Sequence, residues 1–321
     1  MKSKKTHRLL RLFSAPRLAL LALTATFGIA ISQGPPSDAG DKIDAALPAE
    51  PYAQPAEPRR VLIFAVTNGF RHQSIPTGQL MMRMMGGKTG AFEAVVSDDL
   101  ANFEADALAT FDAVCFLNTT GSVFRPHNNV MKDMDEAARA AAREREARLQ
   151  ENLMAFIRGG GGFIGIHAAT DTYYDWPEFG EMINGYFDGH PWNANVDVSI
   201  KVEPGQEDHP LAVMFGGENL DITEEIYQLK HPYDSSNARM LLRLDTERSP
   251  MDRGGIKRDD GDFGVSWARM WGDGRVFYSS LGHNHEIYWH PQIVRHYLAG
   301  IQWALGDLEA DATPVAAADS N

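Results

Sequence analysis

Histidines occur in three turns of the chain, each directly after an apolar run typical of a β-strand. His72 lies in the first turn, His167 in the second, and His283 and His285 in the third. The carboxyl ends of parallel strands meet at one edge of a sheet, where ligands bind in doubly wound folds. A single loop histidine is commonly held by backbone hydrogen bonds. Three such turns at one edge indicate a site that uses imidazole chemistry.

The turn around His167 has the composition of an elbow, in which a strand turns sharply into a helix. Gly165 before the histidine, with Ala168 and Ala169 after it, allows a tight turn that projects one side chain from the sheet edge. The glycine run 159–162 is different. Nucleotide fingerprints place glycines after a strand and before a helix, whereas this run follows a helix and precedes a strand. A phosphate loop is therefore excluded.

One role for these histidines is to bind a divalent metal such as zinc, because imidazole is the commonest protein ligand for such ions. Ligands drawn from separate loops leave no spacing signature, so the sequence identifies candidates and not a fixed set. The candidate ligands are His72, His167, His190 and His283, with Asp171 or Glu225 as an added carboxylate.

The other role is general acid/base catalysis, which needs side chains that exchange protons near neutral pH. The candidate catalytic residues are His167, Asp171, Glu225 and His283. A structural alternative is that His167 only makes backbone hydrogen bonds beneath a layer of aromatic side chains. The residue types leave these alternatives open.

Aromatic residues are frequent in and beside the turns that carry the histidines. Flat rings beside acids and amides suit the apolar faces and hydroxyl groups of sugars, although many such rings are expected to be core residues. The candidate substrate-binding residues are Arg71, His72, Trp176, His190, Trp192 and Tyr227. The sequence thus favours a carbohydrate as the small-molecule partner.

Apolar runs in the first half of the chain predict the strands that position these turns. The strands are predicted at 61–67, 92–98, 112–118 and 162–168, and helices at 77–85 and 131–158. The run 61–67 is apolar without interruption, which is typical of a strand covered on both faces. The order of strands and helices predicts an α/β fold with a doubly wound, mostly parallel sheet.

The second half is richer in strand-like sequence and predicts antiparallel strands that complete the same sheet. They are predicted at 196–202, 240–245, 263–271 and 275–282, with a Gly-Asp-Gly hairpin turn at 272–274. A final helix is predicted at 291–305. We expect this half to extend the first and not to form an independent domain.

The N-terminus has the three parts of a secretory signal: basic residues, an apolar run from Leu18 to Ile31, and small residues after it. We expect a signal peptide at 1–32, a flexible linker at 33–58, a folded domain at 59–308 and a disordered tail at 309–321. The protein is then periplasmic or secreted. If the signal is not cleaved, the alternative is an N-terminal membrane anchor.

Cysteine and charge counts narrow the partners. Cys115 is the only cysteine, so an intrachain disulfide is impossible, and its apolar surroundings predict a packing residue. The formal charge of -13 argues against a nucleic-acid partner, which needs clustered Lys and Arg. No membrane contact is expected apart from the signal segment.

Several stretches of the chain together resemble the ThuA-like, or trehalose-utilisation, family and span nearly all of the folded region. They are GFRHQSIP (69–76), GGGFIGIHAATDT (160–172), WPEFGEMINGYFDGHPW (176–192), DHPL (208–211), ITEEIYQL (222–229) and GRVFYSSLGHNHE (274–286). The second and third are the specific ones. The predicted helix at 131–158 looks longer than the family usually has.

The resemblance implies a flavodoxin-like core of the kind shared with class I glutamine amidotransferases. Those enzymes place a cysteine at the elbow, where this chain has His167. Their late His-Pro-Glu element is also not reproduced at His283-Asn284-His285. Imidazole cannot replace a thiolate in forming a stable thioester, so glutaminase activity is rejected.

The family's link to trehalose and to oxidised (3-keto) disaccharides implies a role in carbohydrate metabolism. We therefore expect an exported enzyme, a lyase, hydrolase or isomerase, that acts on an oxidised glycoside whose ketone acidifies the neighbouring proton. The alternative is a non-catalytic carbohydrate-binding protein. The substrate, the reaction type and the oligomeric state are left open by the sequence.

Overall fold

A nine-stranded sheet carries the histidine turns, in a computed structural model that describes residues 34–315. The strand order is β2-β1-β3-β4-β11-β10-β9-β6-β7. The first five strands in this order are parallel: β2 (Glu93–Val96), β1 (Arg60–Phe64), β3 (Ala113–Leu117), β4 (Gly162–Ile166) and β11 (Gly274–Ser279). The predicted strands of the first half are all present.

The remaining strands extend this sheet in antiparallel fashion, beginning at β11, which pairs with β4 on one side and β10 on the other. They are β10 (Gly264–Trp271), β9 (Arg239–Leu244), β6 (Asp197–Val202) and β7 (Leu220–Thr223). The short strands β5 (Tyr186–Phe187) and β8 (Leu229–Lys230) form a separate ladder. The expected α/β sheet with added antiparallel strands is confirmed.

Strand β1 shows why the sheet needs helices on both faces. Val61 and Ile63 point into one hydrophobic core, and the alternate residues Leu62 and Phe64 point into the other. All four side chains are fully buried. The uninterrupted apolar run predicted this arrangement.

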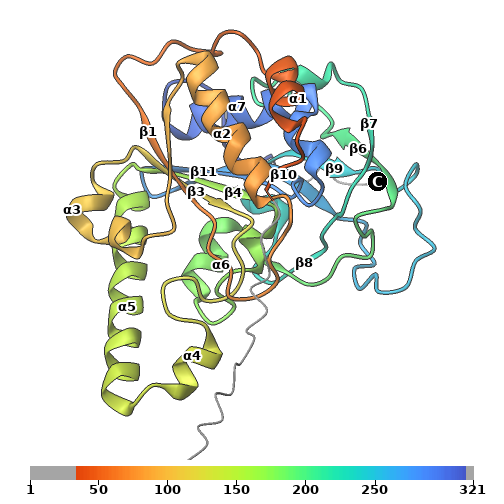
Figure 1. Cartoon of the computed structure of the whole chain (residues 1–321). Helices are drawn as coiled ribbons and strands as arrows, with labels where there is room; N and C mark the ends of the chain where they lie inside the picture. The colour runs from red at the N-terminus through yellow and green to blue at the C-terminus, as the bar shows by residue number, and fades with distance from the viewer. Residues whose placement is uncertain (1–33, 316–321) are drawn as a thin grey trace, which may run out of the picture. The chain divides into compact units, whose positions relative to one another are not determined.

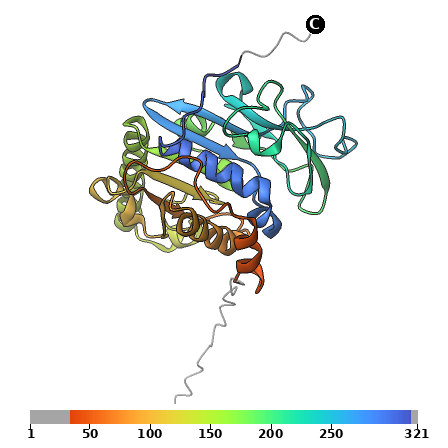
Figure 2. The ribbon, with the colours of Figure 1, turned by 90° about the horizontal axis from the view of Figure 1, so that it is seen from above.

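Figures 1 and 2 show how the helices are divided between these two cores. One face of the sheet is covered by α2 (Ile75–Thr89), α7 (Pro291–Ala304) and α1 (Ala39–Ala46), and the other by α5 (Glu136–Arg158), α6 (Pro177–Ile183) and α3 (Ala105–Leu108). Short 3-10 turns lie between these elements: η1 (Leu100–Phe103), η2 (His167–Asp171), η3 (Val213–Phe215), η4 (Ser235–Asn237) and η5 (His285–Trp289).

The predicted helix at 131–158 is two helices, α4 (Asn128–Asp133) and α5. The break occurs because the Asp135 carboxylate accepts the backbone N–H of Ala138 at 2.8 Å and so caps the start of α5. The glycine run then ends α5 at Arg158, as expected.

The prediction of a flexible linker at 33–58 is wrong for the residues that the structure describes. Helix α1 buries Ala39 and Ile43 in the core it shares with α2. The Gln302 side chain then accepts the backbone N–H of Tyr52 at 2.7 Å and donates to the carbonyl of Ala53 at 2.6 Å. A segment with so few large apolar residues was predicted to be a flexible linker, but these few residues are enough to pack it against the core.

The predicted tail also begins later than expected. His209 Nε2 donates to the carbonyl of Asp311 at 2.9 Å, and Ala312 is buried. The predicted signal peptide at 1–32 lies outside the described residues. Across residues 34–315, no helix combines the length and the apolar character that a bilayer crossing requires.

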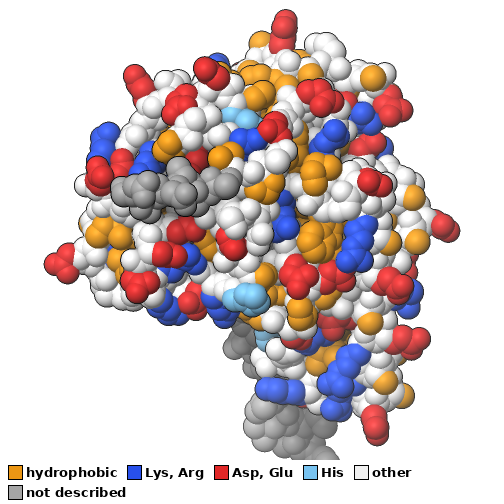
Figure 3. Space-filling view, turned by 180° about the vertical axis from the view of Figure 1, so that it is seen from behind, with side chains coloured by type: hydrophobic (Ala, Val, Ile, Leu, Met, Phe, Trp, Pro, Cys, Tyr) orange, Lys and Arg blue, Asp and Glu red, His pale blue; other side chains and the backbone are white. Residues whose placement is uncertain are grey.

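Charged side chains of both signs are interspersed on the face of the molecule shown in Figure 3. Surface ion pairs follow this pattern, as between Lys42 and Asp38 and between Arg248 and Asp221. Exposed pairs of this kind contribute little to stability.

Candidate active site

His167 stands at the elbow predicted after β4. Its φ is 50°, in the left-handed region that residues other than glycine rarely adopt. The Tyr278 hydroxyl donates to the His167 carbonyl at 2.8 Å and fixes the turn. A Cβ at Gly165 would lie 3.0 Å from the side chains of both Ile183 and Tyr278, so the glycine allows the close packing below the elbow. The side chain of His167 is fully buried.

Hydrogen bonds fix the orientation of the His167 ring. Nδ1 lies 2.6 Å from the carbonyl oxygen of Ser280, which can only accept, so Nδ1 carries the proton. Nε2 is then an acceptor, and the Tyr227 hydroxyl donates to it at 2.9 Å. Metal-binding histidines commonly have one nitrogen held by a carbonyl in this way while the other faces the ion.

His72, from the loop after β1, and His283, from the loop after β11, meet His167 at the same point. The ring of His72 lies 4.8 Å from that of His167 and 5.0 Å from that of His283, and the rings of His167 and His283 are 5.5 Å apart. Each pair is nearly perpendicular. The prediction that the three turns converge at one edge is confirmed in the described structure.

The Glu225 carboxylate is the acidic member of this cluster. Its Oε1 lies 3.2 Å from His283 Nδ1 and 3.6 Å from His167 Nε2. Burial opposes ionisation of this carboxyl group, but the neighbouring imidazoles of His167 and His283 outweigh burial and lower its pKa. The carboxylate therefore stays ionised beside the imidazoles.

The pKa values of the two other histidines of the cluster shift in opposite directions. Burial, reinforced by the neighbouring His167 and His283, lowers the pKa of His72 to about 2, so this ring stays neutral. Burial also opposes a charge on His283, but the Glu225 carboxylate outweighs it and raises the pKa of His283. The buried Nδ1 of His72 has no hydrogen-bond partner among residues 34–315. A buried polar atom without a protein partner leaves a place for a water or a bound ion.

The donor set fits a divalent metal. One ligand atom from each of His72, His167, His283 and Glu225 lies within 4.8 Å of every other. A tetrahedral zinc site with bonds of about 2.1 Å separates its ligand atoms by about 3.4 Å. The distances of 3.2 and 3.6 Å from Glu225 to His283 and His167 match that value.

Glu224 is a residue of the site that the sequence did not single out. Its fully buried carboxylate accepts the backbone N–H groups of Gly282, His283 and Asn284 at 2.9, 2.6 and 3.0 Å. Burial raises the pKa of Glu224, and the three N–H groups oppose that rise. This carboxylate holds the loop that presents His283. The sequence signal that could have identified Glu224 is its position next to Glu225, because two adjacent acidic residues in an apolar run are unusual.

Other predicted residues lie at the margin of the cluster. His190 is half-exposed, and its Nδ1 lies 3.5 Å from Glu225 Oε2, outside the group of four. Asp171 ends η2, where it accepts a hydrogen bond from the Tyr174 hydroxyl. Burial raises the pKa of Asp171, while Tyr174 and His167 oppose that rise. Arg71 is exposed in the same loop as His72.

The predicted substrate-binding role of Trp176 and Trp192 does not fit their surroundings. Trp192 is fully buried, packs against Phe263 and donates its indole N–H to the carbonyl of Pro250 at 2.8 Å. Trp176 packs against Phe179 in the core beneath α6. Both rings are core residues, and neither has a free face for a ligand.

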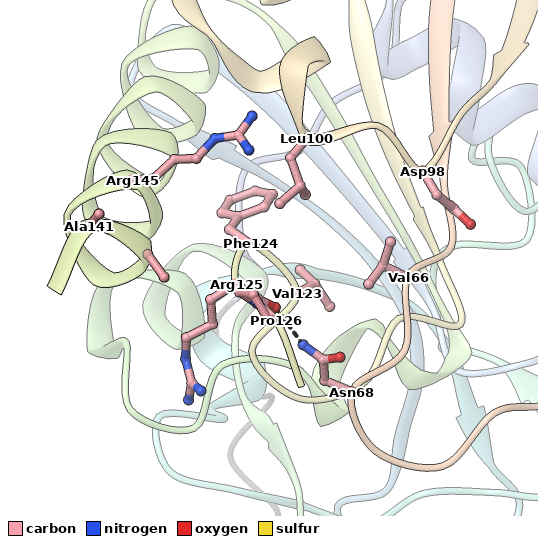
Figure 4. A pocket seen from close by; sticks show the side chains of 11 residues that line it. Val66, Asn68, Asp98, Leu100, Val123, Phe124, Arg125, Pro126, Ala141 and Arg145 are labelled. Carbon is pink, nitrogen blue, oxygen red and sulfur yellow. Dashed lines mark hydrogen bonds between the residues drawn. The ribbon is translucent and has the colours of Figure 1, made fainter. Parts of the chain in front are cut away.

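A cavity of about 540 Å³ lies elsewhere on the same sheet edge, between α5 and the loops after β1 and β3 (Figure 4). None of its lining residues belongs to the histidine cluster. Its arginines already have partners, because Arg125 pairs with Glu146 and Arg145 with Glu104. Asp98 accepts the backbone N–H of Ala65 at 3.0 Å. We therefore take the histidine cluster, and not this cavity, as the candidate active site.

An amidotransferase nucleophile is absent from the elbow, as expected. Cys115 lies in β3, fully buried, and burial raises the pKa of its thiol. A thiol in such surroundings is a packing residue and not a nucleophile.

Known structures share this fold at low sequence identity. A ThuA-like protein from Bacteroides uniformis ATCC 8492 is 18% identical, with a TM-score of 0.55 over 79% of this chain and 94% of that one. A ThuA-like protein from Parabacteroides merdae ATCC 43184 is 16% identical, with a TM-score of 0.50 over 79% and 93%. Cytoplasmic protein STM3548 from Salmonella typhimurium is 12% identical, with a TM-score of 0.50 over 76% and 98%. These likenesses establish the fold.

The sequence itself gives the family. No curated protein matches it. Residues 60–304 match the family ThuA, described as trehalose utilisation, and this range includes every strand and all of the histidine cluster. The fold is the class I glutamine amidotransferase-like one, with histidine in place of cysteine at the elbow. The chain belongs to the ThuA family.

Proposed function

We propose that this protein is an exported, divalent-metal-dependent enzyme that acts on an oxidised glycoside, a sugar with a ketone in its ring. The observation that carries the proposal is the convergence of three imidazoles and one carboxylate from four separate segments. Export is inferred from the N-terminal sequence, and the carbohydrate class from membership of the family.

The residues of the cluster divide into ligands and supports. His72, His167, His283 and Glu225 would hold the ion, and the Ser280 carbonyl would set the ring of His167. The Tyr227 hydroxyl, which donates to His167 Nε2, would release that lone pair to the ion. A bound divalent ion supplies Lewis acidity that polarises a carbonyl oxygen. The low pKa of His72 keeps its ring neutral and therefore able to donate a lone pair.

Asp171 is the base that we assign to the reaction. It lies close enough to His167 for the imidazole to affect its pKa, and burial raises that pKa. Its carboxylate takes the proton from the carbon beside the ketone, and the electron pair of the broken C–H bond forms an enolate. The enolate reforms the ketone as the bond between the glycosidic oxygen and the next carbon breaks, and that oxygen takes up the proton held by Asp171. The products are an unsaturated keto sugar and the released alcohol.

Metal content of the purified protein tests the ligand set. We expect one divalent ion per chain in the wild type and its loss in His167→Ala. His127→Ala is the control, because His127 is exposed and caps α4, away from the cluster. A metal-free wild type that stays metal-free after incubation with zinc, manganese or iron would refute metal dependence.

Turnover of a 3-keto glycoside, followed by release of its aglycone, tests the reaction. We expect Asp171→Asn to retain the metal and to lose at least a hundredfold in kcat, the usual scale for removing a general base. Full activity in Asp171→Asn would assign the proton transfer to another group. Binding of the glycoside without product in the wild type would favour a carbohydrate-binding protein.

A further inference from the structure

Phe70 is the most exposed large apolar side chain of the described residues, with 62% of its surface open to solvent. A phenylalanine this exposed is unusual at a site lined by polar groups, and exposed apolar surface commonly marks a binding site.

The exposed ring stands over the cluster. Its centroid lies 4.8 Å from that of His72, at an interplanar angle of 81°. It lies 6.4 Å from the ring of His283, and these two planes are nearly parallel, at 18°. Phe70 therefore borders the point where the imidazoles converge, and most of its side chain is open to solvent.

The position of Phe70 is fixed by its backbone. Thr120 pins the loop: its carbonyl accepts the N–H of Asn68 at 2.7 Å, and its hydroxyl accepts the N–H of Gly69 at 3.0 Å. The same hydroxyl lies 2.9 Å from the Phe70 carbonyl, to which it donates. The exposure of the ring is a property of a held loop, so the ring can act as a preorganised surface.

A second exposed ring belongs to the same rim. Tyr174, from the segment after η2, is 45% exposed, and its hydroxyl contacts the Asp171 carboxylate. The Lys230 amine lies 4.6 Å from the centre of this ring. This ring thus lies beside a carboxylate and an amine, as Phe70 lies beside two imidazoles.

We propose that Phe70 is the platform on which a pyranose ring of the substrate stacks, with Tyr174 as the second ring of the rim. A pyranose has faces made of C–H bonds and an edge of hydroxyl groups. In this proposal the hydroxyl edge of the stacked sugar extends past the Phe70 ring toward the imidazoles and the carboxylate. The inference rests on the proposed function and specifies its substrate class as a pyranoside with an unsubstituted ring face.

Titration of the metal-loaded protein with methyl α-D-glucopyranoside and with trehalose, followed by NMR, tests this assignment. We expect Phe70→Ala to weaken binding about tenfold, while Phe70→Tyr keeps wild-type affinity because the ring remains. Val213→Ala is the matched control, because Val213 is 45% exposed but lies on η3, outside the rim. Metal content is measured for every variant.

The outcomes separate the platform from the proposed function. Unchanged binding in Phe70→Ala, or equal loss in Phe70→Tyr, would overturn the platform and leave the proposed function standing. A wild-type protein that holds its metal and turns over a 3-keto glycoside but binds neither sugar would overturn the platform alone. A protein that binds neither these sugars nor the 3-keto glycoside would overturn the carbohydrate class as well.

Discussion

At the scale of single residues, the site depends on a histidine held in a strained backbone conformation. His167 at a φ of 50° costs on the order of 1–3 kcal/mol. Such strain persists where surrounding contacts over-determine it, here the bonds to its carbonyl and to both ring nitrogens. The elbow thus fixes one imidazole in space and in tautomer, and the other ligands assemble around it.

The first prediction concerns Glu224, which accepts three backbone N–H groups of the loop that carries His283. Glu224→Gln turns an amide N–H group toward these donors, so we expect the free energy of unfolding to fall by about 1–3 kcal/mol. Zinc affinity should also fall, because His283 loses its support. Urea unfolding and metal titration measure the two effects. Glu218→Gln, at an exposed carboxylate, is the control.

The second prediction concerns His296, a fully buried histidine on α7 that is remote from the proposed ligands in the sequence. Burial, partly opposed by its bond to the Leu211 carbonyl, lowers its pKa from 6.5 to about 4. Below pH 6.5 His296 is protonated in the unfolded chain but stays neutral in the folded chain. The free energy of unfolding therefore decreases as the pH falls toward 4. We expect His296 to account for a loss of about 2 kcal/mol between pH 7 and pH 5.

Urea unfolding of the wild type and of His296→Asn at both pH values checks this. The asparagine keeps a donor for Leu211 but cannot titrate. The wild type should therefore lose more stability than the variant on acidification. Parallel losses in both proteins would show that His296 does not contribute to acid sensitivity.

The sequence identified the centre of the site better than its surroundings. His72, His167 and His283 were found because they stand in strand-end turns, and turn position follows from hydrophobic pattern. Glu225 was named only as one of two candidate carboxylates. Trp192 was misassigned, since an aromatic residue in a loop looks the same whether its ring is exposed or buried. Phe70 was missed for the same reason: exposure depends on packing by distant segments.

At the scale of elements, helix α2 contains neighbouring glycines with opposite requirements. A Cβ at Gly86 would lie 2.3 Å from the backbone oxygen of Phe92, where β2 approaches the helix. A Cβ at Gly87 would meet nothing within 4 Å. The first glycine permits close contact between elements, and the second only weakens the helix.

The third prediction follows from this pair. Gly86→Ala should lower the free energy of unfolding by about 1–3 kcal/mol, because rigid backbone must move. Gly87→Ala should raise it by about 0.5–1 kcal/mol, the usual gain in an exposed helix interior. Each variant is the control for the other in urea unfolding. Equal changes in the free energy of unfolding for the two variants would mean that α2 does not pack closely against the start of β2.

Long apolar runs made most elements predictable, whereas short amphipathic helices were not predicted. The strands of the parallel half follow directly from unbroken apolar sequence. Helix α1 has only Ile43 and a few small residues to bury, too weak a pattern to distinguish it from a tether. The break between α4 and α5 depends on a single cap at Asp135. Local chemistry of this size is visible only once the chain has folded.

At the scale of the whole molecule, the site joins the two parts of the sheet. His72 and His167 come from loops of the parallel half, whereas Glu225 comes from the segment between β7 and β8. The unfolded chain cannot hold these side chains together. Any ion that they bind is therefore a ligand of the folded state alone, and its binding energy adds to the free energy of unfolding.

The last prediction tests this linkage. Zinc at a hundred times its Kd should stabilise the folded state by about 2.7 kcal/mol, which raises Tm by several degrees in a chain of this size. A chelator should reverse the rise. Glu225→Gln should reduce it sharply, because the variant removes the only carboxylate of the four proposed ligands. Glu218→Gln should keep the full rise. A rise of equal size in Glu225→Gln and in the wild type would place the ion elsewhere, because a ligand stabilises only through the residues that bind it.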